Sequence, residues 1–369
     1  MDPFRSSEDE MTDSFDYVKF VREHGDKAAI PGGLLTKQGK QDYVGAVPAV
    51  TGTLFFKDAH TRAVRDAICE CFEEYEAIAK QHLTWLWREE PPEGPDKMAY
   101  PKAAPLREMM KRMNENDLVS FYYVSGKQPH DSGAWEFQVV GRRGWQAKLK
   151  SAGFSSLRFS VPPLYLHQNP RAFQQMFVNF ARRLKAEHGY GGNALVRSVV
   201  RDVDNEPVEA YMAEKLNALD VGTPFGVSRA VVGGIKTVSW LTAINNDMVE
   251  KVGGLSRIRS ELPGGWFAVY DYGNGVVIQA GPQPEIAPVD QNPKPAIYVL
   301  PNMLLKDVRV PQIGSLHGPS LDGEPRIRGQ AAEDWLRRFD VSEEELLPYK
   351  AKLLDEPKLS TETMLPDRL

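Results

Sequence analysis

The sequence predicts an α+β protein whose helices pack on one face of a mostly antiparallel sheet. Two observations favour this class. Apolar stripes at helical spacing lie between short runs that alternate apolar and polar residues, which is the pattern of half-buried strands. The order strand, helix, strand then occurs three times, near residues 50–87, 156–200 and 234–281, without a repeat of the sequence itself. The repetition is therefore one of topology.

The first unit opens with a strand at 49–57, and Asp58 is the expected N-cap of a helix that continues to about Gln81. A strand at 83–87 returns from this helix. The buried side of the helix carries apolar residues at helical spacing: Val64, Ile68, Cys71, Phe72, Tyr75, Ile78 and Ala79. Further elements are expected after a proline-rich loop: a short basic helix at 106–114 and paired strands at 118–125 and 135–141.

The second unit starts with a strand at 156–166, which its prolines bend or place at a sheet edge. Asn169-Pro170 begins a helix, because proline is tolerated at the first helical position. The buried stripe of this helix comprises Phe173, Met176, Phe177, Phe180 and Leu184. We expect a turn at 188–192, with His188 capping the end of the helix. A strand at 193–200 and a helix at 206–217 follow.

The third unit lies between Val232 and Pro284. Its opening alternation predicts a strand at 235–241, and Asn245 or Asn246 caps the helix that follows. Gly253-Gly254 ends that helix, since glycine adopts the left-handed conformation without steric cost. Gly273-Asn274-Gly275 predicts a tight hairpin. Later helices are expected at 297–305 and 330–339.

The two ends of the chain are expected to differ from its middle. Residues 1–45 are polar and should form a flexible arm, and residues 346–369 a loose tail. Residues 46–345 form the α+β domain, with 46–150 and 151–345 as candidate sub-units. A chain of 369 residues with 42% hydrophobic content is long enough to bury a sizeable core.

Charge and cysteine usage narrow the function classes. A net charge of -5 gives no basic excess of the kind that favours direct binding to nucleic acid. Cys69 and Cys71 are two positions apart on a helix, so they face different sides and should be reduced packing thiols. The sequence opens without a basic and apolar leader, and it has no apolar run of membrane-spanning length. We therefore expect a cytoplasmic protein.

We expect no metal, no cofactor and no enzymatic activity, because no motif for these assembles in the sequence. The seven histidines are dispersed without a recognised ligand spacing. His188 lies in a glycine-rich segment, but this segment follows a helix, whereas a phosphate loop precedes one. The acidic run at 202–206 lacks the spacing of an EF-hand and reads as a solvated turn. Ser315 and His317 have no nucleophile elbow around them.

Five segments in a fixed order resemble one protein family. They are GIKTVSWLT from Gly234, DMVEKVGG from Asp247, GVVIQAGPQP from Gly275, SLHG from Ser315 and WLRRFD from Trp335. Together they resemble the DUF3396 family of type VI secretion immunity proteins, which are paired with VRR-Nuc nuclease effectors. The resemblance runs from about residue 52 to 340. One departure lies at 289–292, where Val-Asp-Gln-Asn lacks the glycine of the family's turn.

The resemblance implies a secreted nuclease toxin as the partner, and two features are candidate contacts. One side of the first helix presents a row of carboxylates: Asp66, Glu70, Glu73 and Glu74. Carboxylates suit a nuclease that offers lysines and arginines to phosphates, although a solvated helix face would look the same. Trp145, which follows Arg142-Arg143-Gly144 at a strand end, is the best candidate for an exposed anchor.

The leading hypothesis is an immunity protein that binds a cognate type VI secretion toxin in the cytosol and blocks it sterically. An enzyme of unknown reaction and a structural or adaptor protein of the secretion apparatus are the alternatives. A neighbouring toxin gene would favour the first hypothesis, and a deep polar pocket would favour an enzyme.

Overall fold

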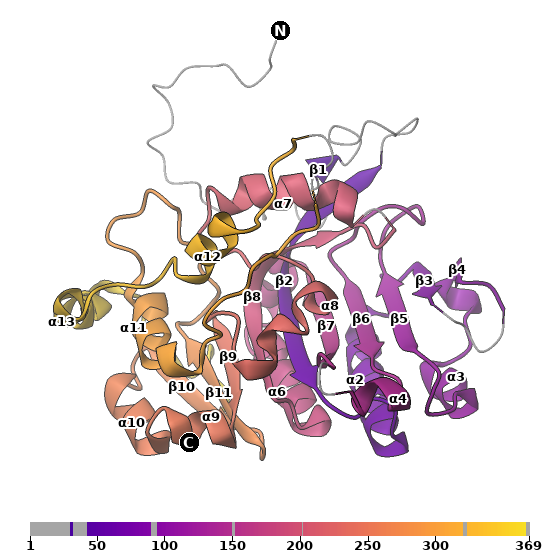
Figure 1. The fold of residues 1–369 in the computed structure, drawn as a ribbon, viewed down its shortest axis with the longest axis horizontal. Helices are drawn as coiled ribbons and strands as arrows, with labels where there is room; N and C mark the ends of the chain where they lie inside the picture. The colour runs from indigo at the N-terminus through magenta and orange to yellow at the C-terminus, as the bar shows by residue number, and fades with distance from the viewer. Residues whose placement is uncertain are drawn as a thin grey trace, which may run out of the picture.

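The structure is a computed structural model that describes residues 30–31, 43–89, 94–149, 152–200, 202–319 and 323–366. One 11-stranded sheet has the order β10-β11-β9-β8-β2-β7-β6-β5-β3-β4, and β1 pairs with β2 beside this path (Figure 1). Each neighbouring pair is antiparallel. The strands are β1 Ile30–Pro31, β2 Val44–Phe56, β3 Trp85–Arg88, β4 Lys97–Ala99, β5 Val119–Val124, β6 Glu136–Gly141, β7 Ser155–Val161, β8 His188–Arg197, β9 Leu241–Asn245, β10 Phe267–Asp271 and β11 Gly275–Ala280.

Helices connect these strands and cover the sheet. The α-helices are α2 Arg62–Ala79, α3 Leu106–Arg112, α4 Gly144–Ala147, α5 Pro163–Gln168, α6 Ala172–Leu184, α7 Glu206–Ala213, α8 Pro224–Val227, α9 Asn246–Lys251, α10 Gly254–Glu261, α11 Ala296–Leu304, α12 Gln330–Leu336 and α13 Glu343–Lys352. The 3-10 helices are η3 Tyr100–Lys102, η4 Val203–Asn205, η5 Ala230–Gly233, η6 Lys306–Val308 and η7 Leu353–Asp355. The predicted α+β class and its strand-helix-strand units are confirmed, as β2-α2-β3, β7-α6-β8 and β9-α9-α10-β10.

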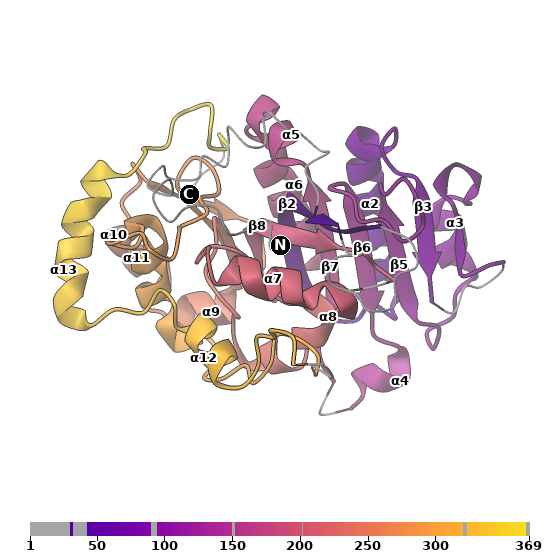
Figure 2. The ribbon, with the colours of Figure 1, turned by 90° about the horizontal axis from the view of Figure 1, so that it is seen from above.

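Helices α2 and α6 lie on one face of the sheet and bury the apolar stripes expected for them (Figure 2). Phe72 of α2 stacks on Tyr123 of β5 with ring centroids 4.1 Å apart, and Phe177 of α6 is fully buried. The close approach of α6 requires glycine in the strand below it. A Cβ at Gly52 would lie 2.6 Å from the Phe159 ring and 3.0 Å from the Phe177 ring.

Helices also cover part of the opposite face, so the expectation that they lie on one face is wrong (Figure 2). α9, α10 and α11 enclose a second core over β9, β10 and β11, and α7, α8 and α12 pack around β2 and β8. The reason is that the strands at this end are apolar on both faces. In β11, Val277 belongs to the first core, whereas Val276 and Ile278 belong to the second.

The segment at 188–192, predicted as a turn, is the start of β8. His188 is fully buried, and its Nε2 donates a hydrogen bond of 2.9 Å to the Val231 carbonyl oxygen. This burial lowers the pKa of His188 to about 4. The glycines of the segment allow close packing, since a Cβ at Gly191 would lie 3.3 Å from the Phe177 ring. His188 is therefore a core residue and not a helix cap.

Three local predictions about element ends need correction or refinement. Thr61, rather than Asp58, caps α2, because its hydroxyl accepts from the Val64 backbone N–H. The strand expected at 235–241 begins only at residue 241, as β9. Asn245 is confirmed as the cap of α9, with its side-chain oxygen accepting from the Met248 N–H at 3.0 Å.

The C-terminal segment is packed against the sheet, contrary to the loose tail predicted for 346–369. Its first part is helical, as α13 and η7. The Thr363 carbonyl oxygen accepts hydrogen bonds from Gln174 at 3.2 Å and from Gln279 at 2.8 Å, and Leu365 is buried. Residues 367–369 and most of the predicted arm at 1–45 lie outside the described residues. The two candidate sub-units share one sheet, because β7 pairs with both β2 and β6.

Candidate partner-binding site

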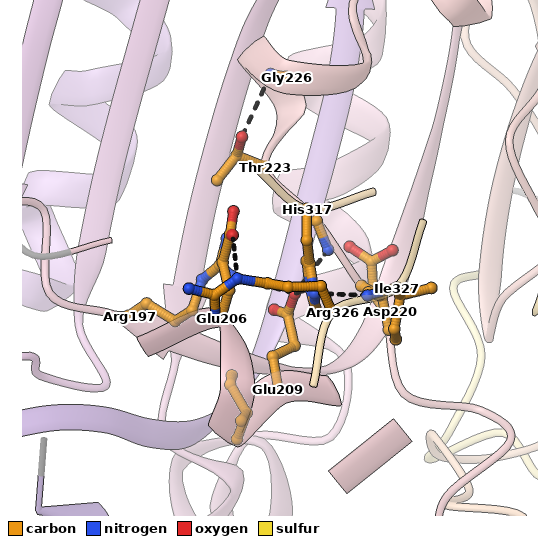
Figure 3. A network of polar contacts seen from close by, with 12 residues as sticks. Arg197, Glu206, Glu209, Asp220, Thr223, Gly226, His317, Arg326 and Ile327 are labelled. Atoms are coloured by element: carbon orange, nitrogen blue, oxygen red, sulfur yellow. Dashed lines mark hydrogen bonds and ion pairs between the residues drawn. The ribbon is translucent and has the colours of Figure 1, made fainter. Parts of the chain in front are cut away.

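A buried ionic network joins β8, α7 and the loop that carries His317 (Figure 3). Arg197 of β8 lies 2.9 Å from Asp202 through Nε and 3.3 Å from Glu209 through Nη1. Glu209 also accepts hydrogen bonds from the Gly222 N–H at 2.7 Å and from His317 Nε2 at 2.8 Å. The acidic segment at 202–206, which was predicted to be a solvated turn, therefore forms an ion pair with the buried Arg197 through Asp202.

The hydrogen bonds of His317 define its tautomer. Nδ1 accepts a hydrogen bond of 3.0 Å from the Ile327 N–H, so the ring hydrogen is on Nε2 and points at Glu209. Burial alone would raise the pKa of Glu209, but Arg197 and His317 outweigh it and hold the pKa at about 2. Both side chains of this Glu–His pair are buried, so a substrate has no access to them. The hydrogen bond between His317 and Glu209 therefore holds the loop against α7.

A second buried group surrounds Lys236. Its Nζ donates to Asp220 at 2.5 Å and lies over the Trp335 ring, 5.3 Å from the centroid. Burial lowers the pKa of Lys236, and Asp220 opposes that effect. Arg338 stacks over Trp335 at 3.7 Å and donates to Thr237 Oγ1 at 3.0 Å. The segments GIKTVSWLT, SLHG and WLRRFD therefore each supply one polar side chain, Lys236, His317 and Arg338 respectively, that ties the segment to the interior.

Within the described ranges, no group of three or more His, Cys, Asp or Glu side chains is placed to hold a metal ion. Cys69 and Cys71 are buried and form no disulfide, and burial raises the pKa of the Cys69 thiol to about 11. Such thiols stay protonated and act in packing. Of the helices in the described part of the chain, none combines the length and the apolar character that crossing a membrane requires.

The sheet has a cavity of about 310 Å³ on the face opposite α2, next to α8. Its floor is a row of side chains at matching register: Trp87 of β3, Tyr122 of β5, Gln138 of β6 and Arg158 of β7. Paired residues on adjacent strands point to the same face, so the row crosses four strands. We call this floor, together with Phe225 and Val200 at the cavity border, the open face.

One carboxylate in the cavity is incompletely paired. Glu136 is 3% exposed, its Oε1 has no hydrogen-bond partner, and Arg158 Nε lies 3.9 Å away. Arg158 itself donates to the Leu195 carbonyl oxygen at 2.9 Å. Burial raises the pKa of Glu136 to about 7, because the distant guanidinium compensates only part of the lost hydration. An ionised Glu136 therefore lacks a close cation.

The open face includes exposed apolar side chains at the cavity border. Phe225 of α8 is 52% exposed and Val200 is 41% exposed. The guanidinium of Arg142 lies over the Phe225 ring, 5.2 Å from the centroid, and donates to Ser228. Trp145 of α4, the predicted anchor, is 51% exposed, and α4 lies on the same side of the sheet as α8 (Figure 2).

The predicted acidic contacts all lie on α2, on the other side of the sheet (Figure 2): Asp66, Glu70, Glu73 and Glu74. Arg107 of α3 donates to Glu73 through two hydrogen bonds of 2.7 and 2.9 Å and lies 3.6 Å from Asp66. Arg183 of α6 pairs with Glu74 and lies 3.7 Å from Glu70. These pairs reduce the negative charge that α2 presents. A role for α2 in partner binding stays a prediction.

Sequence reasoning missed the cavity and Glu136. The floor residues come from four strands, and their neighbourhood depends on the sheet order. The available signal was alternation: in β5, β6 and β7 the residues between the core positions are polar, which is unusual for strands that are covered on both faces. This pattern marks a sheet face that is lined by polar side chains.

Comparison with known proteins identifies the family. A family model described as type VI immunity for VRR-NUC matches residues 67–339. Among solved structures, the chain is similar to the Pseudomonas aeruginosa T6SS protein PA0821, with 48% sequence identity and a TM-score of 0.89, over 96% of this chain and 99% of that chain. No curated protein matches the sequence. The chain belongs to the family of type VI immunity proteins for VRR-NUC.

Proposed function

We propose that this protein binds a VRR-Nuc nuclease effector of the type VI secretion system in the cytosol and blocks it sterically, without catalysis. The observation that carries the proposal is the family match over residues 67–339. The similarity to a T6SS protein over nearly its whole length supports it. A nuclease damages a bacterial cell where the DNA lies, so an inhibitor must meet it in the same compartment.

We assign the contact to the open face and to Trp145 of α4, which is on the same side of the sheet. This side of the molecule combines a cavity, a polar floor and exposed aromatic and aliphatic side chains, which is the composition of protein interfaces. Phe225 and Trp145 are each about half exposed, and aromatic anchors of this kind supply much of the binding energy at interfaces. An interface of standard size, about 1,600 Å² in total, would extend from the cavity over α8 towards α4.

The lining of the cavity favours binding over catalysis. Among the described residues that line it there is no histidine, cysteine or lysine. A Ser–His or Cys–His pair, or a lysine nucleophile, would need such residues. The buried pair of Glu209 and His317 is closed to solvent. An enzyme of unknown reaction is therefore the weaker explanation of the polar cavity.

Co-expression with the effector encoded by the adjacent gene tests the proposal. We expect the protein to restore growth and to co-purify with the effector as a one-to-one complex. To compete with the excess of DNA, its affinity should be nanomolar or tighter, about -12 kcal/mol. Growth arrest without rescue, and no complex in gel filtration, would contradict the function itself.

A matched pair of surface variants tests the assigned face. Phe225→Ser and Leu347→Ser each remove an exposed apolar side chain, but Leu347 lies on α13 at the far end of the molecule (Figure 2). We expect Phe225→Ser to raise Kd at least tenfold and Leu347→Ser to leave it unchanged. Equal effects of the two substitutions would place the interface elsewhere.

A further inference from the structure

The charges around the cavity are unbalanced. Four carboxylates and three guanidiniums line it. Arg197 is committed to Asp202 and Glu209 in the buried network, and Arg158 donates to a backbone carbonyl oxygen. Glu136 is the buried carboxylate that these internal contacts leave without a close partner at Oε1.

We propose that the cavity receives one lysine or arginine side chain of the VRR-Nuc effector, whose cationic group pairs with Glu136. This inference rests on the proposed function and deepens it, because it names the chemistry of the partner residue. A buried carboxylate without a close cation is costly, and a partner that supplies the cation with well-placed hydrogen bonds removes that cost. The unbound protein therefore already presents a carboxylate with which a basic side chain of the partner can pair.

The shape of the cavity suits a long basic side chain. Phe225 and Val200 at the border offer apolar surface to its methylene groups, and Gln138 of the floor lines the same cavity as Glu136. An acidic side chain would instead meet the repulsion of Glu136.

A basic residue is also what a nuclease can offer. Nucleases bind the phosphates of DNA through lysine and arginine side chains. A side chain of this kind that is inserted beside Glu136 is withdrawn from the DNA. The same contact would then provide both affinity and inhibition.

Binding of the full-length protein to the catalytically inactive effector, measured by calorimetry, tests the inference. Glu136→Gln keeps the shape of the side chain and removes its charge. We expect Kd to rise at least tenfold, which corresponds to about 1.4 kcal/mol. Glu343→Gln on α13, an exposed carboxylate far from the cavity, is the matched control and should leave Kd within twofold. An unchanged Kd for Glu136→Gln would overturn the inference while wild-type binding still supports the proposed function.

A double-mutant cycle identifies the partner residue. Each lysine and arginine of the effector is replaced by alanine and measured against both wild type and Glu136→Gln. We expect one position whose replacement costs at least tenfold with wild type and less than threefold with Glu136→Gln. If no position couples to Glu136, the cationic occupant is excluded. If wild type itself does not bind, the proposed function fails and the inference with it.

A second variant avoids any effect of Glu136 on folding. Val200→Lys places an ammonium group at the cavity border, on a residue that is already exposed, where it competes with the incoming side chain. Leu347→Lys adds the same charge on α13. We expect only Val200→Lys to weaken binding, by at least fivefold. Equal binding by both variants would count against occupation of the cavity.

Discussion

Lys236 and Glu136 are both buried ionisable residues, but they differ in how completely they are paired. Lys236 Nζ donates to Asp220 at 2.5 Å and to the Val221 carbonyl oxygen at 2.8 Å. Glu136 approaches a cation no closer than the 3.9 Å to Arg158 Nε. A buried ion pair contributes to a fold mainly through the cost of breaking it. The first residue therefore serves the fold, and the second is available for a partner.

Replacing Lys236 should destabilise the protein strongly. Lys236→Met leaves Asp220 buried without its cation, so we expect the free energy of unfolding to fall by about 3–5 kcal/mol. The double variant Lys236→Met/Asp220→Asn removes the stranded charge and should recover part of the loss. Urea denaturation followed by circular dichroism measures both. A loss below about 1 kcal/mol for the single variant would mean that Asp220 finds another partner.

The effect of Glu136→Gln on the free energy of unfolding should depend on pH. The folded-state pKa of Glu136 is about 7, above the ordinary 4.5, so the folded state retains the proton at higher pH than the unfolded state does. The penalty for ionising Glu136 is absent below about pH 4.5, grows between pH 4.5 and 7, and is complete above pH 7. Relative to its effect at pH 4.5, Glu136→Gln should stabilise the protein at pH 8 by about 1–3 kcal/mol. Denaturation at the two pH values checks this, and an identical effect at both would refute it.

At the scale of elements, α6 depends on the strand beneath it. Phe177 is fully buried over Gly52, where a side chain would collide with two aromatic rings. Phe177→Ala should lower the free energy of unfolding by about 3–5 kcal/mol, through lost burial and the cavity left behind. Chemical denaturation measures this cost. A loss under about 1 kcal/mol would show that the core around α6 collapses to fill the space.

The acidic side of α2 gives a kinetic prediction. If its carboxylates steer the effector, changing Glu70, Glu73 and Glu74 together to Lys should slow association several-fold and weaken its dependence on salt. The ion pairs to Arg107 and Arg183 are partly exposed, so the fold should lose only about 0–1 kcal/mol for each pair. Stopped-flow association at two salt concentrations measures the effect.

An equal change of charge elsewhere is the control for α2. Glu250, Glu343 and Glu344 are exposed on α9 and α13, and their replacement by Lys alters the net charge by the same amount. Slower association of the α2 variant alone would support the predicted contact. Equal rates for the two variants would remove α2 from the interface and leave the open face in place.

Local patterns were sufficient for elements whose side chains follow one regular face. The aromatic stripe of α6 and the hairpin at Gly273-Asn274-Gly275 were predicted from the sequence and are present. They were insufficient where a residue serves a distant contact. The alternation at 235–241 suggested a strand, but Lys236 turns inwards to Asp220. The glycines after His188 suggested a turn, but they belong to a strand, and Gly191 among them admits the rings of α6.

The candidate site shows the same limit. Trp145 was singled out because it follows a strand end, and it is exposed. Glu136 gave no local signal, because its lack of a partner depends on Arg158, which is distant in sequence and adjacent only across β6 and β7. Such a cavity can be inferred only after the order of the strands is known.

For the whole molecule, the C-terminal segment should contribute to stability. Gln279 of β11 donates to Thr363, the Leu365 N–H donates to Tyr270, and the Leu359 N–H donates to Gly265. Removing residues 357–369 would uncover apolar surface of β10 and leave Gln279 without one of its partners. We expect a loss of at least about 2 kcal/mol in the free energy of unfolding. Leu365→Ala is a milder form of the test, and unchanged stability in both would contradict the packing.

Lys236, His317 and Arg338 of the GIKTVSWLT, SLHG and WLRRFD segments make contacts inside the fold, whereas the open face is built from side chains outside those segments. Trp87, Tyr122 and Gln138 stand on three separate strands whose opposite sides form the main core. Exchanging such outward side chains leaves the buried framework intact. The scaffold can therefore be retargeted: a new toxin specificity requires new side chains on one sheet surface, and the same interior can support inhibitors of different nucleases.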